Sequence, residues 1–149
     1  MRSLGLDVGD KRTGVAISDP QGLVAVPLTV IAKGEDMAID DIIELVEQHR
    51  IERIVLGLPR SLNGSLGQQA DKVAAFAEKL SLRARQCNLR QLDIQLWDER
   101  FSTVVADRLM AEVGTKRNKR KQHRDAIAAT VILQGFLDSR HPEQSEESG

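Results

Sequence analysis

The stretch from residue 4 to residue 18 limits the possible folds of this chain more than any other. Two apolar runs, at residues 2–8 and 12–18, flank a short polar turn, which is typical of a β-hairpin. Gly9 and Gly14 suit a close approach of the backbone beside that turn. We therefore expect the chain to begin with two antiparallel strands.

The unusual residue in this stretch is Asp7, which lies inside the first apolar run. Burying a carboxylate is costly unless it is paired or bound to a cation. One interpretation is that Asp7 accepts hydrogen bonds from backbone amides of the neighbouring turn. The other is that Asp7 is a metal ligand at the end of a strand. This stretch alone leaves both interpretations open.

Later segments alternate between strand and helix patterns. A third strand is expected at residues 23–31, where Pro27 favours a sheet edge because proline cannot donate a hydrogen bond to a neighbouring strand. Apolar residues recur at helical spacing over residues 35–49, and the apolar run 53–58 is typical of a buried strand. The same patterns predict a helix at residues 66–86, a strand at 92–97, a helix from Ser102 to about Glu112 and a last helix at 122–138.

This order of elements predicts an α/β fold. We expect a five-stranded mixed sheet, in which an antiparallel meander is joined by two parallel strands, with helices flanking the sheet. One domain is expected at residues 1–138, followed by a flexible acidic tail at residues 139–149. In such sheets, ligands gather at strand ends near a topological switch point.

Composition restricts the possible functions. The net charge of the 149-residue chain is -1, so affinity for phosphate must come from locally clustered basic residues. The single cysteine, Cys87, excludes an internal disulfide and fits a reducing cytoplasm, and no segment is expected to cross a membrane. Aromatic residues make up only 3% of the chain, which weakens any scheme of base stacking over several rings.

Three acidic residues stand where a packed fold does not favour them. Asp7 and Glu99 fall at the carboxyl ends of the first and fifth predicted strands, and Asp125 shares a helix face with apolar residues. If these two strands are near neighbours, the three carboxylates converge. Each also has a simple structural explanation: Glu99 pairs with Arg100 or caps a helix, and Asp125 benefits from the dipole of a helix N-terminus.

Clustered carboxylates repel one another and are stable only with cations among them. Mg²⁺ and Mn²⁺ are suited to carboxylate oxygens. Two such ions ~4 Å apart activate a water molecule and stabilise the leaving oxygen in phosphodiester hydrolysis. The three histidines lack zinc-site spacing. We therefore expect Mg²⁺ or Mn²⁺ as the cofactor, with Asp7, Glu99 and Asp125 as ligands.

Basic residues near these acids are candidates for binding phosphate. Residues 116–121, in a predicted link before the last helix, hold five basic residues in six positions. A charge run is usually a solvated face, but its place beside the predicted site favours phosphate binding, which would be sensitive to salt. The candidate substrate-binding residues are Lys11, Arg12, Arg60, Arg100, Lys116, Arg117, Lys119, Arg120 and Lys121.

Four sequence blocks together are similar to one known family. They are Leu6-Asp7-Val8-Gly9 with Lys11-Arg12-Thr13-Gly14-Val15-Ala16, Gly57-Leu58-Pro59 through Asn63-Gly64-Ser65, Asp98-Glu99-Arg100-Phe101-Ser102-Thr103, and Asp125 with Ala128-Ala129 and Ile132-Leu133-Gln134. From about residue 4 to residue 138 the chain resembles the YqgF family of bacteria, also called RuvX-type pre-16S rRNA nucleases, which have a ribonuclease H-like fold. The first block alone also resembles the phosphate loop of actin-like and sugar-kinase ATPases, but their second phosphate loop and adenosine site are not found in this sequence.

The resemblance implies that Asp7, Glu99 and Asp125 are metal ligands and that the protein trims the 5′ end of precursor 16S rRNA during ribosome assembly. We expect its partner to be this RNA or the pre-ribosome, with the protein as a monomer or weak dimer. Holliday-junction resolvases of the same fold generally use a fourth acid near the last helix, where this chain has Gln122 and His123. Junction resolution is the second hypothesis, and a non-catalytic RNA-binding assembly factor is the third.

Overall fold

The computed structural model of this protein describes residues 1–58, 68–98 and 117–140. The strands in these ranges are β1 (Ser3–Val8), β2 (Thr13–Ser18), β3 (Ala25–Ile31), β4 (Arg53–Leu58) and β5 (Asp93–Asp98). The helices are α1 (Glu35–His49), α2 (Gln68–Gln86) and α4 (Arg117–Arg140). The expected helix from Ser102 to Glu112 and the expected tail beyond residue 140 lie outside the described residues.

The five strands form one mixed sheet in the order β3-β2-β1-β4-β5. Strands β1, β2 and β3 pair antiparallel, and β1, β4 and β5 run parallel to one another. This arrangement confirms the predicted fold class. It also confirms the edge position of Pro27, because β3 is an outer strand. Strand β1 occupies the centre, and β4 lies between it and β5.

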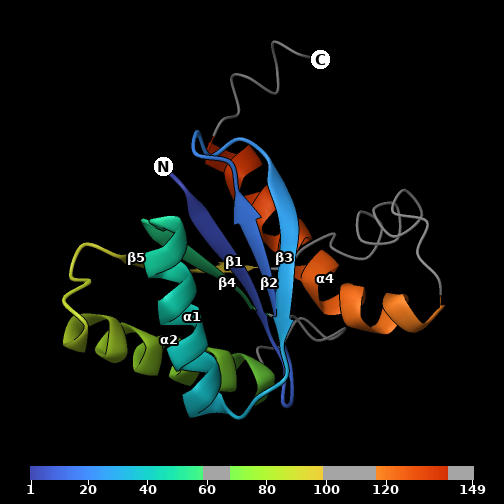
Figure 1. The fold of residues 1–149 in the computed structure, drawn as a ribbon, viewed down its shortest axis with the longest axis horizontal. Helices are drawn as coiled ribbons and strands as arrows, with labels where there is room; N and C mark the ends of the chain where they lie inside the picture. The colour runs from blue at the N-terminus through green and yellow to red at the C-terminus, as the bar shows by residue number, and fades with distance from the viewer. Residues whose placement is uncertain (59–67, 99–116, 141–149) are drawn as a thin grey trace.

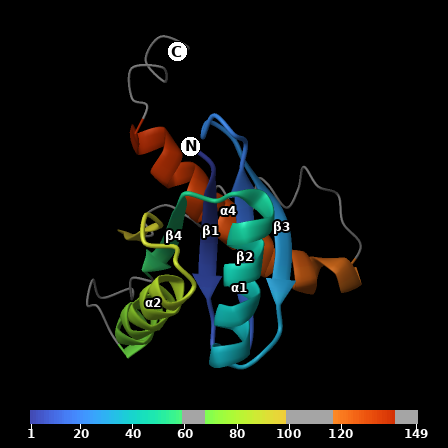
Figure 2. The same ribbon diagram turned by 60° about the vertical axis from the view of Figure 1, so that its left-hand side comes forward.

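Helices cover both faces of the sheet (Figure 1). Helices α1 and α2 lie on one face, and α4 crosses the other face over β1, β2 and β3. Figure 2 shows the same three layers from the side of α2. Because side chains alternate along a strand, β1 sends Leu4 and Leu6 into the core beneath α1 and α2, and turns Gly5 and Asp7 toward α4. No helix in the described ranges combines the length and apolar character needed to span a membrane.

Helix α4 begins earlier than the sequence pattern predicts. The expected start was residue 122, after a basic link, but the helix already includes Arg117 and runs on to Arg140. The reason is that Lys and Arg are good helix formers, and no Gly or Pro lies between Gly114 and residue 122. Asp125 is therefore two turns inside the helix, too far from its N-terminus to be explained by the helix dipole, whose effect fades within the first turn.

The carboxyl-terminal half of α4 is anchored over β4 and β5 by an aromatic contact. The rings of Trp97 and Phe136 meet edge to face with centroids 5.7 Å apart. The buried guanidinium of Arg53 lies 5.1 Å from the centre of the Phe136 ring and contacts the Asp93 carboxylate at 3.2 Å. Trp97 thus packs in the second core cluster, beneath α4.

A side-chain amide on α4 fixes the helix to the start of the edge strand. Gln134 Oε1 accepts a hydrogen bond from the N–H of Ala25 at 2.8 Å, and its Nε2 donates to the carbonyl of Leu23 at 3.0 Å. The amide takes the place of a neighbouring strand at this point. Gln134 therefore connects the position of α4 to that of β3.

We expect Gln134→Ala to lower the free energy of unfolding by about 1–2 kcal/mol, since two partly buried backbone groups lose their partners. Urea denaturation followed by circular dichroism measures this change. The matched control is Gln48→Ala, at an exposed position of α1, which should change stability by less than about 0.5 kcal/mol. Equal effects of the two substitutions would show that the amide does not hold the helix.

Candidate active site

The candidate site lies where α4 crosses the ends of β1 and β2. Asp7 is next to last in β1 and faces α4. On the neighbouring strand its partner is Gly14, and Gly5 is opposite Ala16 in the same ladder. The two glycines stand on the side of the sheet that α4 covers.

Both glycines are required for the helix to come this close. A Cβ atom at Gly5 would lie 2.8 Å from the carbonyl oxygen of Ala129, and one at Gly14 would overlap the carbonyl oxygen of Asp125. The backbone of α4 thus rests directly on the two strands at these points. Because Gly14 is also the partner of Asp7, the contact brings Asp125 beside Asp7.

The two carboxylates interact electrostatically. The pKa of Asp7 is raised from its ordinary value of 3.8 to about 6, first because the group is buried and second because the negative charge of Asp125 repels its ionised form. Two acidic side chains from distant parts of the chain therefore share one partly buried place. Two ionised carboxylates in close contact are unfavourable in such a partly buried place.

The alternative role of Asp7, as an acceptor for amides of the neighbouring turn, does not fit this environment. Such hydrogen bonds would lower its pKa, and the pKa is raised. The turn closes without it, because the N–H of Gly9 donates to the carbonyl of Arg12 at 2.8 Å. The raised pKa of Asp7 comes from burial and from the charge of Asp125, so a cation bound nearby would favour its ionised form.

The third expected ligand, Glu99, lies outside the described residues. Within the described part of the chain, no group of three or more His, Cys, Asp or Glu side chains is placed to hold a metal ion. The structure therefore brings together two of the three predicted acids. Their catalytic role and the place of Glu99 stay predictions.

The basic candidates divide into three groups. Lys11 and Arg12 are exposed on the turn between β1 and β2, next to the end of β1 that carries Asp7. Arg117, Lys119, Arg120 and Lys121 belong to the first turns of α4. Arg60, Arg100 and Lys116 lie outside the described residues.

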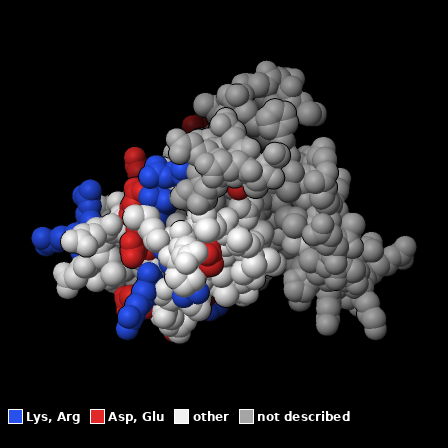
Figure 3. Space-filling view, turned by 90° about the horizontal axis from the view of Figure 1, so that it is seen from above, with Lys and Arg blue, Asp and Glu red and all other residues white. Residues whose placement is uncertain are grey.

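Many other cations of the described surface already have acidic partners. Lys72 pairs with Asp10 at 3.1 Å, and Lys79 pairs with Glu35 at 3.1 Å. In the view of Figure 3, basic and acidic side chains of the described residues alternate over the surface. Much of the basic charge on the described surface is therefore neutralised locally.

Sequence reasoning identified Gly14 as a place of close backbone approach but not its partner. The contact with the main chain of Asp125 depends on how deeply α4 sits on the sheet. One sequence feature could have predicted this close contact between helix and sheet. Small residues recur on both sides of it, at Gly5 and Gly14 on the strands and at Ala129 on the helix.

The order of the mixed sheet, with helices on both faces, is that of a ribonuclease H-like fold. The solved structure of Thermus thermophilus RuvC with a Holliday junction substrate is similar over 94% of this chain and 96% of its own, with a TM-score of 0.57 and 13% identity. The yeast mitochondrial Holliday junction resolvase Ydc2 is similar over 99% of this chain and 86% of its own, with a TM-score of 0.54 and 11% identity. At such identities the likeness concerns the fold alone.

The chain belongs to the RuvX family. The family model, described as "Holliday junction resolvase", matches residues 1–139. A relative from Bacillus mycoides is 47% identical over 143 residues, covering 94% of this chain and 100% of the relative, and one from Bacillus cereus is 48% identical over the same shares. Both are named "Putative pre-16S rRNA nuclease". The resemblance predicted from the four sequence blocks is thus confirmed.

The raised pKa of Asp7 predicts a gain in stability when its charge is removed. The folded state holds the Asp7 proton more tightly than the unfolded state does. Protonated Asp7 therefore imposes no penalty on the fold below pH 4, and this favourable state is lost as the pH rises through the folded pKa of about 6. At pH 7 the raised pKa lowers the free energy of unfolding of the metal-free protein by up to about 3 kcal/mol, compared with an Asp7 whose pKa is the same in the folded and unfolded states. Asp7→Asn should raise its free energy of unfolding at pH 7 by about 1–3 kcal/mol.

This gain should shrink toward zero at pH 4, measured by urea denaturation of metal-free protein at both pH values. Glu52→Gln removes an exposed carboxylate and should change stability little at either pH. A loss of stability in Asp7→Asn at pH 7 would contradict the described environment of Asp7.

The contact of Gly14 with α4 yields a second expectation. Gly14→Ala should destabilise the protein by about 1–3 kcal/mol, because the added methyl group displaces the helix backbone. Gly34→Ala is the matched control, since a Cβ there meets nothing within 4 Å; it should cost no more than about 1 kcal/mol at this helix N-cap.

A displaced helix also separates the two carboxylates. The stabilisation by Asp7→Asn should therefore be smaller in the Gly14→Ala background, which a double-mutant cycle of unfolding free energies measures. Strict additivity of the two substitutions would show that Gly14 does not set the distance between Asp7 and Asp125.

Proposed function

We propose that this protein is a divalent-metal-dependent nuclease that hydrolyses phosphodiester bonds in precursor 16S rRNA. The observation that carries the proposal is the pairing of Asp7 and Asp125, two partly buried carboxylates that repel each other. Membership of a nuclease family supports the class of reaction. The names of the relatives support the substrate.

The donor set fits a hard divalent cation. Carboxylate oxygens are the ligands that Mg²⁺ and Mn²⁺ prefer, and no cationic side chain is among the causes that set the pKa of Asp7, which are burial and the charge of Asp125. Asp7 and Asp125 would hold the ion, with Glu99 as the third proposed ligand. When bound, such an ion lowers the pKa of water and stabilises charge on the leaving oxygen.

The other proposed roles, which are to hold the aspartates in place and to bind the substrate, belong to the chain's own residues. The aspartates are held in place before substrate arrives, because β1 is the central strand and α4 is seated on Gly5 and Gly14. Lys11 and Arg12, which are exposed on the adjoining turn, would bind phosphates of the substrate strand. We include Arg117, Lys119, Arg120 and Lys121, in the first turns of α4, as further proposed phosphate-binding residues.

The test is cleavage of a precursor 16S leader RNA, and of a DNA of the same sequence, in Mg²⁺ or Mn²⁺. Wild-type protein should cut the RNA, and chelation of the metal should abolish cutting. Asp7→Asn and Asp125→Asn should each reduce the rate at least about a hundredfold, the range for removing one charge-stabilising group from an active site.

Asp71→Asn, which removes a carboxylate at an exposed position of α2, is the control and should cut at the wild-type rate. Since Asp7→Asn should not unfold the protein, its loss of activity would report on chemistry. If Asp7→Asn cuts as fast as wild type, the assignment of the site fails. Binding of the RNA without any metal-dependent cutting would instead indicate a non-catalytic assembly factor, and preferential cutting of a four-way DNA junction would indicate a resolvase.

A further inference from the structure

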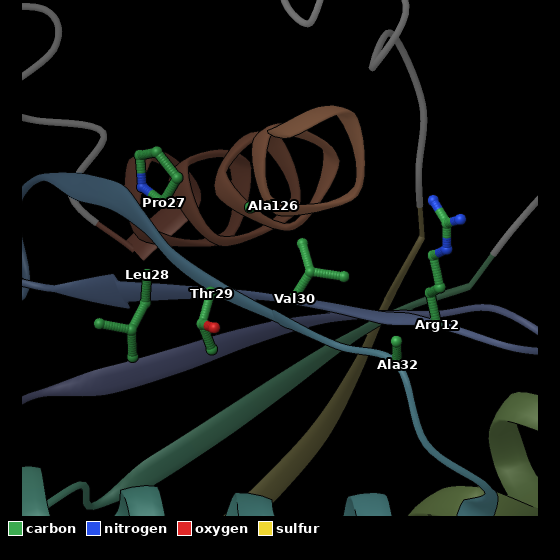
Figure 4. A pocket seen from close by; sticks show the side chains of 7 residues that line it. All are labelled: Arg12, Pro27, Leu28, Thr29, Val30, Ala32 and Ala126. Carbon is green, nitrogen blue, oxygen red and sulfur yellow. The ribbon is translucent and has the colours of Figure 1, made fainter. Parts of the chain in front are cut away.

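A groove of about 500 Å³ lies between the edge strand β3 and helix α4 (Figure 4). Its apolar walls among the described residues are Pro27 and Val30 from β3 and Ala126 from α4, with Ala32 just beyond the strand. Arg12 stands at one end. This volume lies within the usual range for sites that bind small organic groups.

A β-bulge gives the groove its shape. Val15 of β2 is opposite Thr29, whereas the next residue, Ala16, is opposite Pro27, so Leu28 is the extra residue. As a result, Pro27 and Val30 both point toward α4, while the side chains of Leu28 and Thr29 point the other way (Figure 4). Leu28 and Thr29 line the groove with their main chain, which on an edge strand has N–H and C=O groups that face away from the sheet.

The groove adjoins the two aspartates. Gly14 is the partner of Val30 on one side and of Asp7 on the other, so the three residues form one row across the sheet. Strands lie ~4.8 Å apart, which puts Val30 about 10 Å from Asp7. On the helix, Ala126 directly follows Asp125. The groove and Asp7 thus lie about 10 Å apart along this row, with the backbone of α4 resting on Gly14 between them.

The charge beside the groove suits a phosphate. Arg12 is exposed and forms no ion pair with any residue that the structure describes, unlike Lys72 and Lys79. Its guanidinium is able to bind a phosphate through two parallel hydrogen bonds. The first turns of α4, whose sequence is rich in Lys and Arg, project past β3 (Figures 1 and 2).

We propose that this groove binds the base of an unpaired RNA nucleotide next to the bond that is cut, with Arg12 on its phosphate. The inference rests on the proposed nuclease function and narrows its substrate to RNA that is single-stranded at the cleavage site. A base has flat apolar faces and a polar edge, which match apolar walls beside exposed main-chain groups. A base in a duplex is stacked and paired, so it reaches such a groove only after leaving the helix.

The experiment uses a short single-stranded RNA in three forms: intact, with one base removed at each position in turn, and annealed to its complement. Cleavage rates are measured in Mn²⁺, and binding is measured by fluorescence anisotropy with Asp7→Asn protein. For wild type we expect removal of one particular base beside the cut to reduce the rate about tenfold, equivalent to 1.4 kcal/mol. Annealing should reduce it at least as much.

Ala32→Leu places a larger side chain at an exposed position of the groove. It should weaken binding and cutting of the intact single strand about tenfold and abolish the sensitivity to the missing base. The matched control is Ala75→Leu, the same replacement at an exposed position on α2, which should behave as wild type. Arg12→Ala should weaken binding and reduce its dependence on salt.

The inference is overturned if removal of every base has the same effect, if the duplex is cut as fast as the single strand, or if Ala32→Leu equals Ala75→Leu. Each of these results leaves the nuclease function intact. If wild type cuts no RNA in either metal, the proposed function fails, and anisotropy still decides whether the groove recognises one unpaired base.

Discussion

The site depends on the close contact between the backbone of α4 and the two glycines beneath it. A helix packed on a sheet through ordinary side chains would stand farther away, and its carboxylate would reach solvent and not Asp7. Gly5 and Gly14 remove that layer of side chains at two points along the helix. The aromatic contact at one end of α4 and the amide of Gln134 near the start of β3 then fix its direction. Local absence of side chains, and not an added interaction, is what brings the acids together.

The same contact lowers the stability of the folded protein. Pushing two carboxylates together at the edge of a core opposes folding, as the raised pKa of Asp7 shows. The surrounding sheet offsets it, because β1 is central and Leu4 and Leu6 are fully buried on its other face. A protein that needed only to fold would not retain this pair. The position of Asp7 in an otherwise apolar strand, beside Asp125 of α4, is the physical argument for a bound cation.

The sequence predicted the strongly periodic parts of the fold well. Helix α1 and strand β4 have the bounds expected from their apolar spacing. The start of α4 was wrong because its first turns are basic, and charged residues form helix without showing an apolar stripe. The facing of Asp125 toward the sheet followed from helical spacing, but its depth did not, since spacing defines a direction and not a distance. The groove was not foreseen either, because it follows from a bulge at Leu28 that appears only when β2 and β3 are paired.

The edge strand illustrates how one irregularity serves two needs. An open strand edge is a template for pairing with another chain, and proteins commonly protect it with proline and bulges. Strand β3 has both, in Pro27 and the bulge at Leu28, and these disrupt the regular ladder that a second strand would require. The same irregularity turns Pro27 and Val30 to one side and leaves main-chain groups exposed between them. Protection against strand pairing thus leaves an irregular edge with exposed main-chain groups, two strands away from Asp7.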